Sequence, residues 1–260
     1  MNFEFLGLKK LISTGYKKDG RGVKLVYDGD RNGNRTVDDE EVQVTELEGD
    51  GDFRSPECVK LLDEADIVVT NSPFSLFREY VAQLVGHGKK FLILGNINAI
   101  TYKEIFPLIK ANKIWIGYNF NKTMEFQLDE SYEKWNEIRD GKKYGKVPAI
   151  AWFTNLDVKK HYEKLVLTEK YDKVRYPKFY NYDAINVDKT VDIPKDYDGV
   201  MGVPISYLMR HNPEQFEIVG ELNSGSDNEF DYATPMINGK MKYTRILIKR
   251  KQVSGQEIAR

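Results

Sequence analysis

The stretch Asp66-Ile-Val-Val-Thr-Asn-Ser-Pro-Phe-Ser-Leu-Phe-Arg-Glu-Tyr-Val-Ala-Gln-Leu84 decides the fold of this chain. Residues 67–70 are apolar or β-branched without alternation, which is typical of a buried strand. Ser72 and Pro73 end that strand. Apolar residues then recur at helical spacing, at Leu76, Phe77, Tyr80, Val81 and Leu84. Strand, turn and helix in this order build open α/β sheets, in which ligands bind at the carboxyl ends of the strands.

The turn between this strand and helix, Asn71-Ser-Pro-Phe74, has the chemistry to hold a flat ring that forms hydrogen bonds. Asn71 offers one acceptor and two donors. Pro73 stiffens the turn, and Phe74 offers a face for stacking. Taken in isolation, these four residues are better explained as an N-cap and turn that open the next helix.

Longer segments give this turn a specific context. Asn71-Ser-Pro-Phe74 resembles the Asn-Pro-Pro-Phe/Tyr signature of amino-methylating DNA methyltransferases, with Ser72 in place of the first Pro. The chain resembles the EcoRI-type adenine-specific DNA methyltransferase family in particular. The segments that resemble it are residues 70–84, Phe91-Leu-Ile-Leu-Gly-Asn96, Ala99-Ile-Thr-Tyr-Lys-Glu-Ile105, Ala151-Trp-Phe-Thr-Asn-Leu-Asp157, Asn181-Tyr-Asp-Ala-Ile-Asn186 and Tyr197-Asp-Gly-Val-Met-Gly-Val-Pro204. Together they extend over nearly the whole chain.

The resemblance implies a site-specific DNA adenine-N6 methyltransferase of a restriction-modification or phage system. It would transfer a methyl group from S-adenosyl-L-methionine to a flipped adenine in double-stranded DNA. By the same resemblance, the Asn71 side-chain oxygen and the Ser72 carbonyl accept hydrogen bonds from N6. Pro73 fixes the turn, and Phe74 stacks on the adenine. Ser supplies a backbone carbonyl as Pro does, so replacing the first Pro of the signature by Ser72 keeps the hydrogen-bond acceptor. It loses only the rigidity of two consecutive prolines.

The cofactor residues implied by the resemblance precede a predicted helix over residues 56–65. Ser55 is the expected N-cap of that helix, and Pro56 its first residue. Asp52 would accept a hydrogen bond from the exocyclic amine of S-adenosylmethionine, and Phe53 would cover its adenine ring. A plain turn followed by a core Phe explains these two residues equally well.

Strands and helices alternate along the first half of the chain, which predicts an α/β domain with a mostly parallel sheet. The predicted strands cover residues 6–14, 23–27, 41–47, 67–70, 90–94, 113–118 and 147–154, and a helix interrupted by Pro107 covers 102–111. The resemblance makes this a Rossmann-like methyltransferase fold in a catalytic domain over residues 1–155. A mixed α+β target-recognition region is expected over residues 156–260.

The first strand of the family, which lies in the middle of its sheet, has no counterpart in this sequence. Two inner strand edges would then lack backbone partners. We therefore expect a fragment, or a chain completed by a second polypeptide that supplies the missing segment. The alternative is a catalytically inactive DNA-binding remnant or subunit without a complete cofactor site.

Composition bounds the remaining function classes. Hydrophobic residues make up 41% of the 260 residues and charged residues 30%, as in ordinary globular proteins. The net charge of -1 means that any DNA surface must come from local clustering of basic residues. Neither a membrane-spanning run nor a signal peptide is present, so no membrane partner is expected. A single cysteine, Cys58, excludes an internal disulfide and favours a cytoplasmic protein.

No metal site is predicted. The loop from Asp30 to Glu41 resembles a calcium-binding EF-hand loop, with oxygen-bearing side chains at its first, third, fifth, ninth and twelfth places. Arg35, however, occupies the place where the sharp turn needs Gly, and the flanks are typical of strands. A solvated hairpin tip is therefore the favoured interpretation. The three histidines are scattered without the spacing of zinc ligands.

Overall fold

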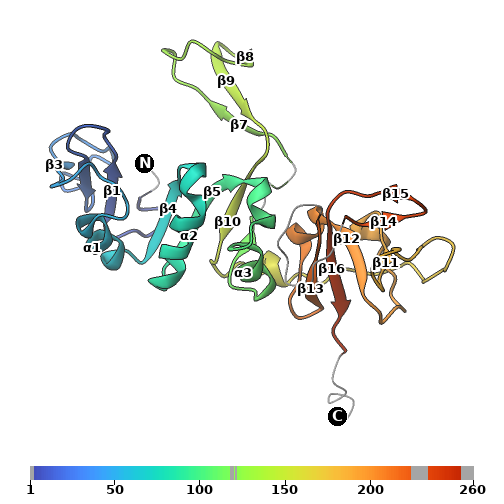
Figure 1. Cartoon of the computed structure of the whole chain (residues 1–260). Helices are drawn as coiled ribbons and strands as arrows, with labels where there is room; N and C mark the ends of the chain where they lie inside the picture. Colours follow the sequence, from blue (N-terminus) through green and yellow to red (C-terminus); the bar gives the residue numbers. More distant parts are fainter. Residues whose placement is uncertain (1–2, 118–119, 121, 224–233, 253–260) are drawn as a thin grey trace, which may run out of the picture. The chain divides into compact units, whose positions relative to one another are not determined.

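A computed structural model of the chain describes residues 3–117, 120, 122–223 and 234–252. The chain divides into two compact units, Met1–Val68 and Val69–Arg260. Figure 1 follows the strands and helices of both along the sequence. Each unit is described by itself below.

The first unit holds a three-stranded antiparallel sheet and one helix. Its strands are β1 (Leu11–Gly15), β2 (Val23–Tyr27) and β3 (Gln43–Glu46), in the order β1-β2-β3, and its helix is α1 (Pro56–Glu64). The predicted cap of this helix is confirmed, because the Ser55 side chain accepts a hydrogen bond from the Cys58 amide at 3.2 Å. Pro56 lies in the first turn, where its missing N–H costs nothing.

The loop between β2 and β3 is held by its own carboxylates. Asp30 accepts hydrogen bonds from the amides of Gly33 and Arg35, at 2.6 and 2.7 Å. Arg35 has a φ of 61°, so it adopts the left-handed conformation for which the sequence argument required Gly. Glu41 is only 4% exposed and accepts from the Arg31 amide at 2.7 Å. The hairpin position is confirmed, whereas the expectation of a solvated tip is wrong for Glu41.

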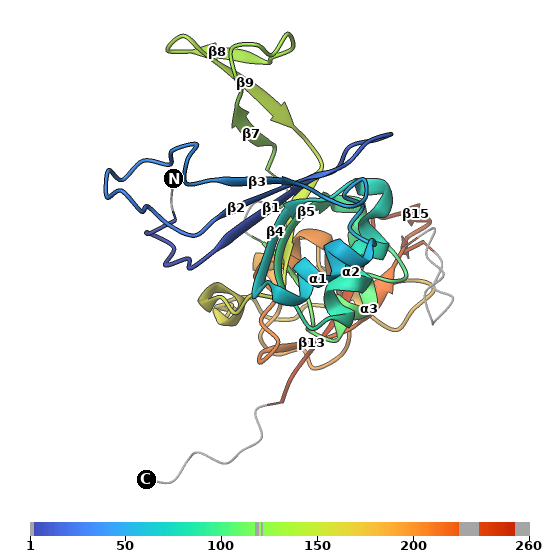
Figure 2. The same ribbon diagram turned by 90° about the vertical axis from the view of Figure 1, so that its left-hand side faces the viewer.

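The second unit is organised around a four-stranded sheet. Its strands are β4 (Ile67–Asn71), β5 (Lys90–Asn96), β10 (Ile150–Thr154) and β6 (Trp115–Ile116), in the order β4-β5-β10-β6. The boundary between the units falls within β4, after Val68. Its helices are α2 (Phe77–Gly86) and α3 (Phe106–Lys110), with 3-10 segments η1 (Phe74–Leu76) and η2 (Ile97–Thr101). Figure 2 shows β4 beside β5, as the strand order requires.

The direction of β10 corrects the expectation of a mostly parallel sheet. β10 pairs antiparallel with β5, with Ile150 opposite Asn96, and antiparallel with β6, with Phe153 opposite Ile116. The strand that returns after β6 is inserted between β5 and β6 and runs opposite to both. A mixed α/β architecture is therefore present, with antiparallel pairs that alternation alone did not predict.

Two further details differ from the sequence expectations. β4 was expected to be buried, but Ile67 is 50% exposed and Val69 is 65% exposed. Exposed and half-buried residues alternate along β4, so one face of this strand is uncovered. Within the described residues β4 is also the edge strand of its sheet. The helix expected from residue 102 begins only at Phe106, because Pro107 is tolerated in a first turn and not in a helix interior.

The rest of the second unit consists of sheets and short 3-10 segments. A ribbon is formed by β7 (Met124–Gln127), β9 (Lys142–Val147) and β8 (Glu137–Arg139), in that order. A mixed sheet follows the order β11 (Ile185–Asn186), β12 (Met201–Pro204), β16 (Arg245–Arg250) and β13 (Phe216–Leu222). The remaining elements are β14 (Met236–Ile237), β15 (Lys240–Met241), η3 (Lys159–Tyr162), η4 (Thr190–Asp192) and η5 (Ile205–Arg210). Among the described residues after 155, all helical segments are of the 3-10 type. The expected mixture of α-helices and strands in this region is therefore confirmed for the strands only.

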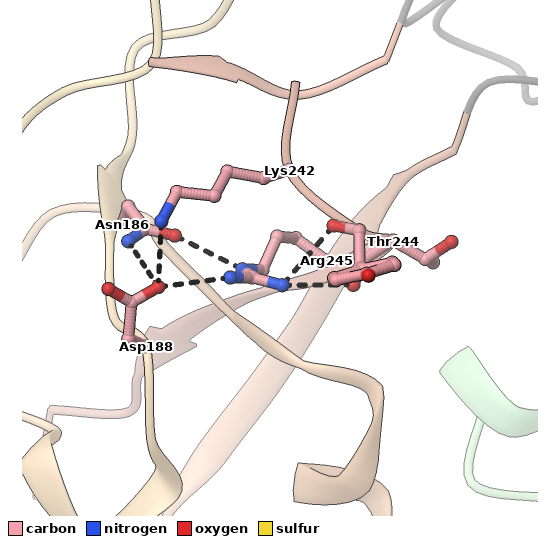
Figure 3. Close-up of polar contacts among 6 residues, drawn as sticks. Asn186, Asp188, Lys242, Thr244 and Arg245 are labelled. Atoms are coloured by element: carbon pink, nitrogen blue, oxygen red, sulfur yellow. Dashed lines mark hydrogen bonds and ion pairs between the residues drawn. The ribbon is translucent and has the colours of Figure 1, made fainter. Parts of the chain in front are cut away.

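A buried arginine joins two strands of this mixed sheet. The Arg245 side chain is 7% exposed and donates to Asn186 Oδ1 and Asp188 Oδ1, both at 3.1 Å. Lys242 Nζ adds a contact of 3.3 Å to the same Asp188 oxygen (Figure 3). Because Asn186 belongs to β11 and Arg245 to β16, these bonds span the intervening strand β12.

Candidate active site

The turn predicted as the site follows directly from the end of β4. Asn71 is the last residue of the strand, and Pro73 adopts φ -57° and ψ 124°. The Pro73 carbonyl accepts a hydrogen bond from the Leu76 amide at 3.0 Å, which starts the 3-10 segment η1. The sequence Asn-Ser-Pro-Phe therefore forms a short, stiff connection between strand and helix.

The packing of Phe77 fixes where this turn lies on the sheet. Phe77 is the first residue of α2 and is 1% exposed. Its ring meets the ring of Phe153 with centroids 4.9 Å apart and covers Gly95 on β5. The helix that follows β4 and η1 thus begins beside the carboxyl end of β5. The carboxyl ends of β4 and β5 consequently lie at the same edge, where open sheets bind ligands.

The side chains of the turn divide into accessible and buried groups. Asn71 is exposed, and Phe74 is 42% exposed, so an acceptor and a stacking face are both available to a ligand. Ser72 is only 5% exposed, and its hydroxyl oxygen has no hydrogen-bond partner among the described residues. The side chains of Asn71 and Phe74 are therefore accessible to a ligand, whereas the side chain of Ser72 is buried.

Residues at the end of β5 join the same edge, although sequence reasoning missed them. Asn96 ends the strand and accepts a hydrogen bond from the Asn98 amide at 2.9 Å, which caps η2. The Ile97 amide donates to the carbonyl of Ala149 at 2.9 Å. The signal was present in the sequence as polar residues directly after a buried strand, the same pattern that identified Asn71.

An exposed ion pair links the first turn of α2 to the segment after η2. Arg78 lies 3.6 Å from Glu104 and stacks over the ring of Tyr102, with 5.4 Å from the guanidinium carbon to the ring centroid. Both charged side chains remain solvent-accessible, so this pair contributes little stability. It brings a cation close to the edge that carries Asn71.

The predicted cofactor residues, Asp52 and Phe53, lie in the first unit and precede α1. Asp52 forms a two-pronged ion pair with Arg54, at 2.9 Å to Nε and 2.7 Å to the terminal nitrogen. Hydrogen bonds from Arg54 lower the pKa of the Asp52 carboxyl below its usual value. Phe53 is half-buried, with the Arg54 guanidinium 5.3 Å from its ring centroid. The carboxylate is thus ionised and already engaged on both oxygens, with lone pairs left to accept a further bond.

A separate cavity of about 280 Å³ opens at the other end of the sheet. Its lining includes Leu92, near the amino end of β5, and the side chains of Trp115, Trp152 and His161. The Trp115 ring stacks on His161 with centroids 4.5 Å apart, and burial lowers the pKa of that histidine. This apolar cavity does not include the turn at Asn71 and is not part of the candidate site.

The described residues contain neither a metal-binding cluster nor a membrane-spanning helix. Among them, no three or more His, Cys, Asp or Glu side chains are arranged to hold a metal ion. None of the helices within the described ranges combines the length and apolar character needed to cross a bilayer.

Comparison with known proteins places the chain in a family. The family model described as "Adenine-specific methyltransferase EcoRI" matches residues 1–251. The Type II methyltransferase M.EcoRI of Escherichia coli is 46% identical over 268 residues, which cover 97% of this chain and 81% of the relative. The Type II methyltransferase M.MgeORF184P of Mycoplasma genitalium is 39% identical over 272 residues, which cover 97% of this chain and 82% of the relative. The Type II methyltransferase M.MpnI of Mycoplasma pneumoniae is 36% identical over 269 residues, which cover 96% of this chain and 81% of the relative. No solved structure matches the chain significantly. The chain therefore belongs to the EcoRI family of adenine-specific methyltransferases.

Proposed function

We propose that the turn Asn71-Ser-Pro-Phe74 is the adenine pocket of this DNA methyltransferase. The reaction class follows from the family, whose members are Type II adenine-specific methyltransferases. S-adenosyl-L-methionine supplies the methyl group when bound. The turn acts on the acceptor: Asn71 Oδ1 and the Ser72 carbonyl accept hydrogen bonds from the N6 amine of a flipped adenine.

One observation carries this assignment, namely the packing of Phe77 against Gly95. It supports a position for Asn71 and Phe74 at the carboxyl edge of the sheet, with both side chains accessible. The N6 lone pair is delocalised into the ring, so two acceptors steer the nitrogen towards tetrahedral geometry. Stacking on Phe74 contributes about 1–3 kcal/mol and offsets much of the few kcal/mol spent on flipping the base. Positioning supplies the remaining rate.

The cofactor assignment extends this proposal to the first unit. Asp52 and Phe53 would hold the adenine of S-adenosylmethionine, with the carboxylate accepting from its exocyclic amine and the ring covering its face. The half-buried Phe53 and the ionised Asp52 fit these roles in part, because Arg54 already occupies both carboxylate oxygens. We further propose a Rossmann-like catalytic domain over residues 1–155 and a target-recognition region over residues 156–260.

The second candidate is an inactive DNA-binding remnant or subunit. The observations in its favour are that β4 is the edge strand of its sheet within the described residues and that Ile67 and Val69 on one of its faces are exposed. An unpaired strand edge exposes backbone donors and acceptors to which another chain can pair. Without a complete cofactor site, such a remnant or subunit would bind DNA and transfer no methyl group.

The decisive experiment replaces the side-chain acceptor. Asn71→Ala removes the oxygen that would hold N6, whereas Asn71→Asp retains an acceptor oxygen at the same place. We expect Asn71→Ala to abolish transfer of labelled methyl groups to duplex DNA, and Asn71→Asp to retain part of it. DNA affinity should change little in either variant, because phosphate contacts dominate it. Normal methyl transfer by Asn71→Ala would show that the assigned site is wrong.

A further inference from the structure

The ribbon formed by β7, β9 and β8 leaves the sheet at the edge that carries the proposed adenine pocket. Figures 1 and 2 both show it extending away from the sheet of the second unit. Its carboxyl-terminal stem reaches Ala149, whose carbonyl accepts a hydrogen bond from Ile97, directly after the end of β5. Ile150 then pairs with Asn96. We refer to residues 122–147 as the arm.

The base of the arm is anchored in the apolar layer of the sheet. Met124, the first residue of β7, is 6% exposed and packs with Leu94, Ile150 and Trp152. This cluster attaches the arm to the carboxyl end of β5 and the amino end of β10. Beyond this cluster, β9 extends for six residues, a length of about 20 Å. Beyond Tyr144 only β8 and β9 pair, so the outer part of the arm is a ribbon of two strands. Such a ribbon fits the major groove of DNA, which is about 8.5 Å deep.

The tip of the arm is a tight, well-defined turn. Asp140 and Gly141 both have positive φ, 49° and 75°, as two-residue hairpin turns require. The register therefore places Arg139 opposite Lys142, and Ile138 opposite Lys143. β9 has the sequence Lys-Lys-Tyr-Gly-Lys-Val and bears three lysines without an acidic residue.

The cations of the arm are combined with aromatic rings. Lys143 Nζ lies 4.4 Å from the centroid of the Trp135 ring, and the Arg139 guanidinium carbon lies 4.0 Å from that of Tyr144. The nearby acids on β7 and β8 are engaged, since Arg139 pairs with Glu125 and, at 3.2 Å, with Glu137. The exposed lysine of the tip, Lys142, has no carboxylate partner among the described residues of the arm.

One face of the arm is apolar and exposed. Phe126 lies opposite Gly145 and shares this face with Ile138, and their exposed fractions are 39% and 55%. Trp135, under Lys143, is 45% exposed. Apolar side chains grouped on a projecting ribbon are unfavourable in water and indicate a partner. The same side chains suit the sugars and thymine methyl groups of a DNA groove.

We infer that the arm is a DNA-contacting element, which enters a groove of the duplex beside the flipped adenine. The target base must reach Asn71 at this edge, so the duplex lies over the place from which the arm projects. Lys142 at the tip contacts a phosphate, and Ile138 on the apolar face contacts the groove wall. The inference rests on the proposed function only for the position of the duplex. The arm would be a DNA-contacting surface in addition to the target-recognition region proposed over residues 156–260.

Equilibrium binding to a fluorescent DNA duplex at several salt concentrations tests this inference. Each lysine–phosphate contact adds about 0.9 to the slope of log K against log salt. We expect Lys142→Ala to weaken binding and to reduce that slope by about 0.9. Ile138→Ser should weaken binding by about fivefold without changing the slope, because it removes an apolar contact. Both positions are exposed, so neither substitution disturbs the packing at Met124.

The matched control is Lys90→Ala, an exposed lysine at the amino end of β5 and hence at the opposite edge of the sheet. It should leave affinity and slope unchanged. Equal slopes for the wild type and Lys142→Ala, an equal loss with Lys90→Ala, or no duplex binding by the wild type would each overturn the inference. If Lys142→Ala or Ile138→Ser changed the sedimentation of the protein but not its DNA affinity, the inference would also be overturned. The arm would then be an interface between two copies of this chain. Since no methyl transfer is measured, a failure of the Asn71 assignment would leave these results interpretable.

Discussion

The ring of Phe77 occupies the space in which a side chain on Gly95 would lie. A Cβ atom built on Gly95 would come within 2.5 Å of the Phe77 ring and within 2.9 Å of the Phe153 ring. This contact joins the first residue of α2 to the carboxyl end of β5. The position of the turn proposed as the adenine pocket therefore depends on the absence of a side chain at residue 95.

Gly95→Ala should destabilise the protein and impair methyl transfer. The added methyl group must displace the ring of Phe77 from a closely packed core, at a cost of about 1–3 kcal/mol. Denaturant unfolding measures the loss of stability. Gly86→Ala is the control, because no heavy atom lies within 4 Å of its added Cβ and its φ is ordinary. Equal stability of the two variants would contradict the packing described for Phe77.

Ser72→Ala should stabilise the protein while preserving methyl transfer. The Ser72 hydroxyl is buried without a hydrogen-bond partner in the described chain, and such a group costs about 1–3 kcal/mol. The substitution keeps the backbone carbonyl, which is the acceptor in the proposed pocket. Thermal unfolding and a methyl-transfer assay test the two parts separately.

Ser72→Pro extends the same argument to the stiffness of the turn. Proline retains the carbonyl and restricts the unfolded chain, so activity should be preserved or raised. If Ser72→Ala and Ser72→Pro both fold but lose activity, the hydroxyl has a role that the backbone does not explain.

Local pattern predicted the elements of the site, whereas contacts distant in sequence decided their environment. The strand ending at Asn71 and the helix over Phe77–Gly86 follow from apolar spacing within about 20 residues, and both are confirmed. The exposure of Val69 and the reversed direction of β10 depend on which strands pair, which no short window encodes. The polar residue Asn96 after a buried strand was a signal in the sequence, but the packing of Phe77 on Gly95, which puts the end of β5 at the same edge as the end of β4, was not.

The pH dependence of stability should contain a contribution from Glu221 on β13. Glu221 is 2% exposed, and burial raises its pKa to about 7 from an ordinary value of 4.5. The folded state then keeps a proton that the unfolded state loses, so this contribution to stability falls as the pH rises from about 4.5 to 7. Above pH 7 it changes no further.

Glu221→Gln isolates this effect. The free energy of unfolding of the variant should rise relative to that of the wild type by up to about 1 kcal/mol per pH unit across this range. Comparison with the wild type is needed because burial lowers the pKa of His211 to about 3, which gives the opposite trend in acid. Glu217→Gln, which removes an exposed carboxylate from the same strand, is the control. If the free energies of unfolding of Glu221→Gln and the wild type changed in parallel with pH, the prediction would be wrong.

Arg245→Met should destabilise the second unit far more than Lys242→Met, although both side chains contact Asp188 (Figure 3). Asn186 is 3% exposed, and its carbonyl oxygen would lose the Arg245 donor, so we expect a loss of about 2–4 kcal/mol. Lys242 is 33% exposed and meets a carboxylate that is 60% exposed, so its removal should cost about 1 kcal/mol or less. Urea unfolding in low and high salt separates the two contributions. Salt screens the exposed Lys242 contact and leaves the buried bond to Asn186 largely intact. Similar losses for both variants, or a loss for Arg245→Met that salt abolishes, would mean that Arg245 acts as a surface charge and does not hold β11 to β16.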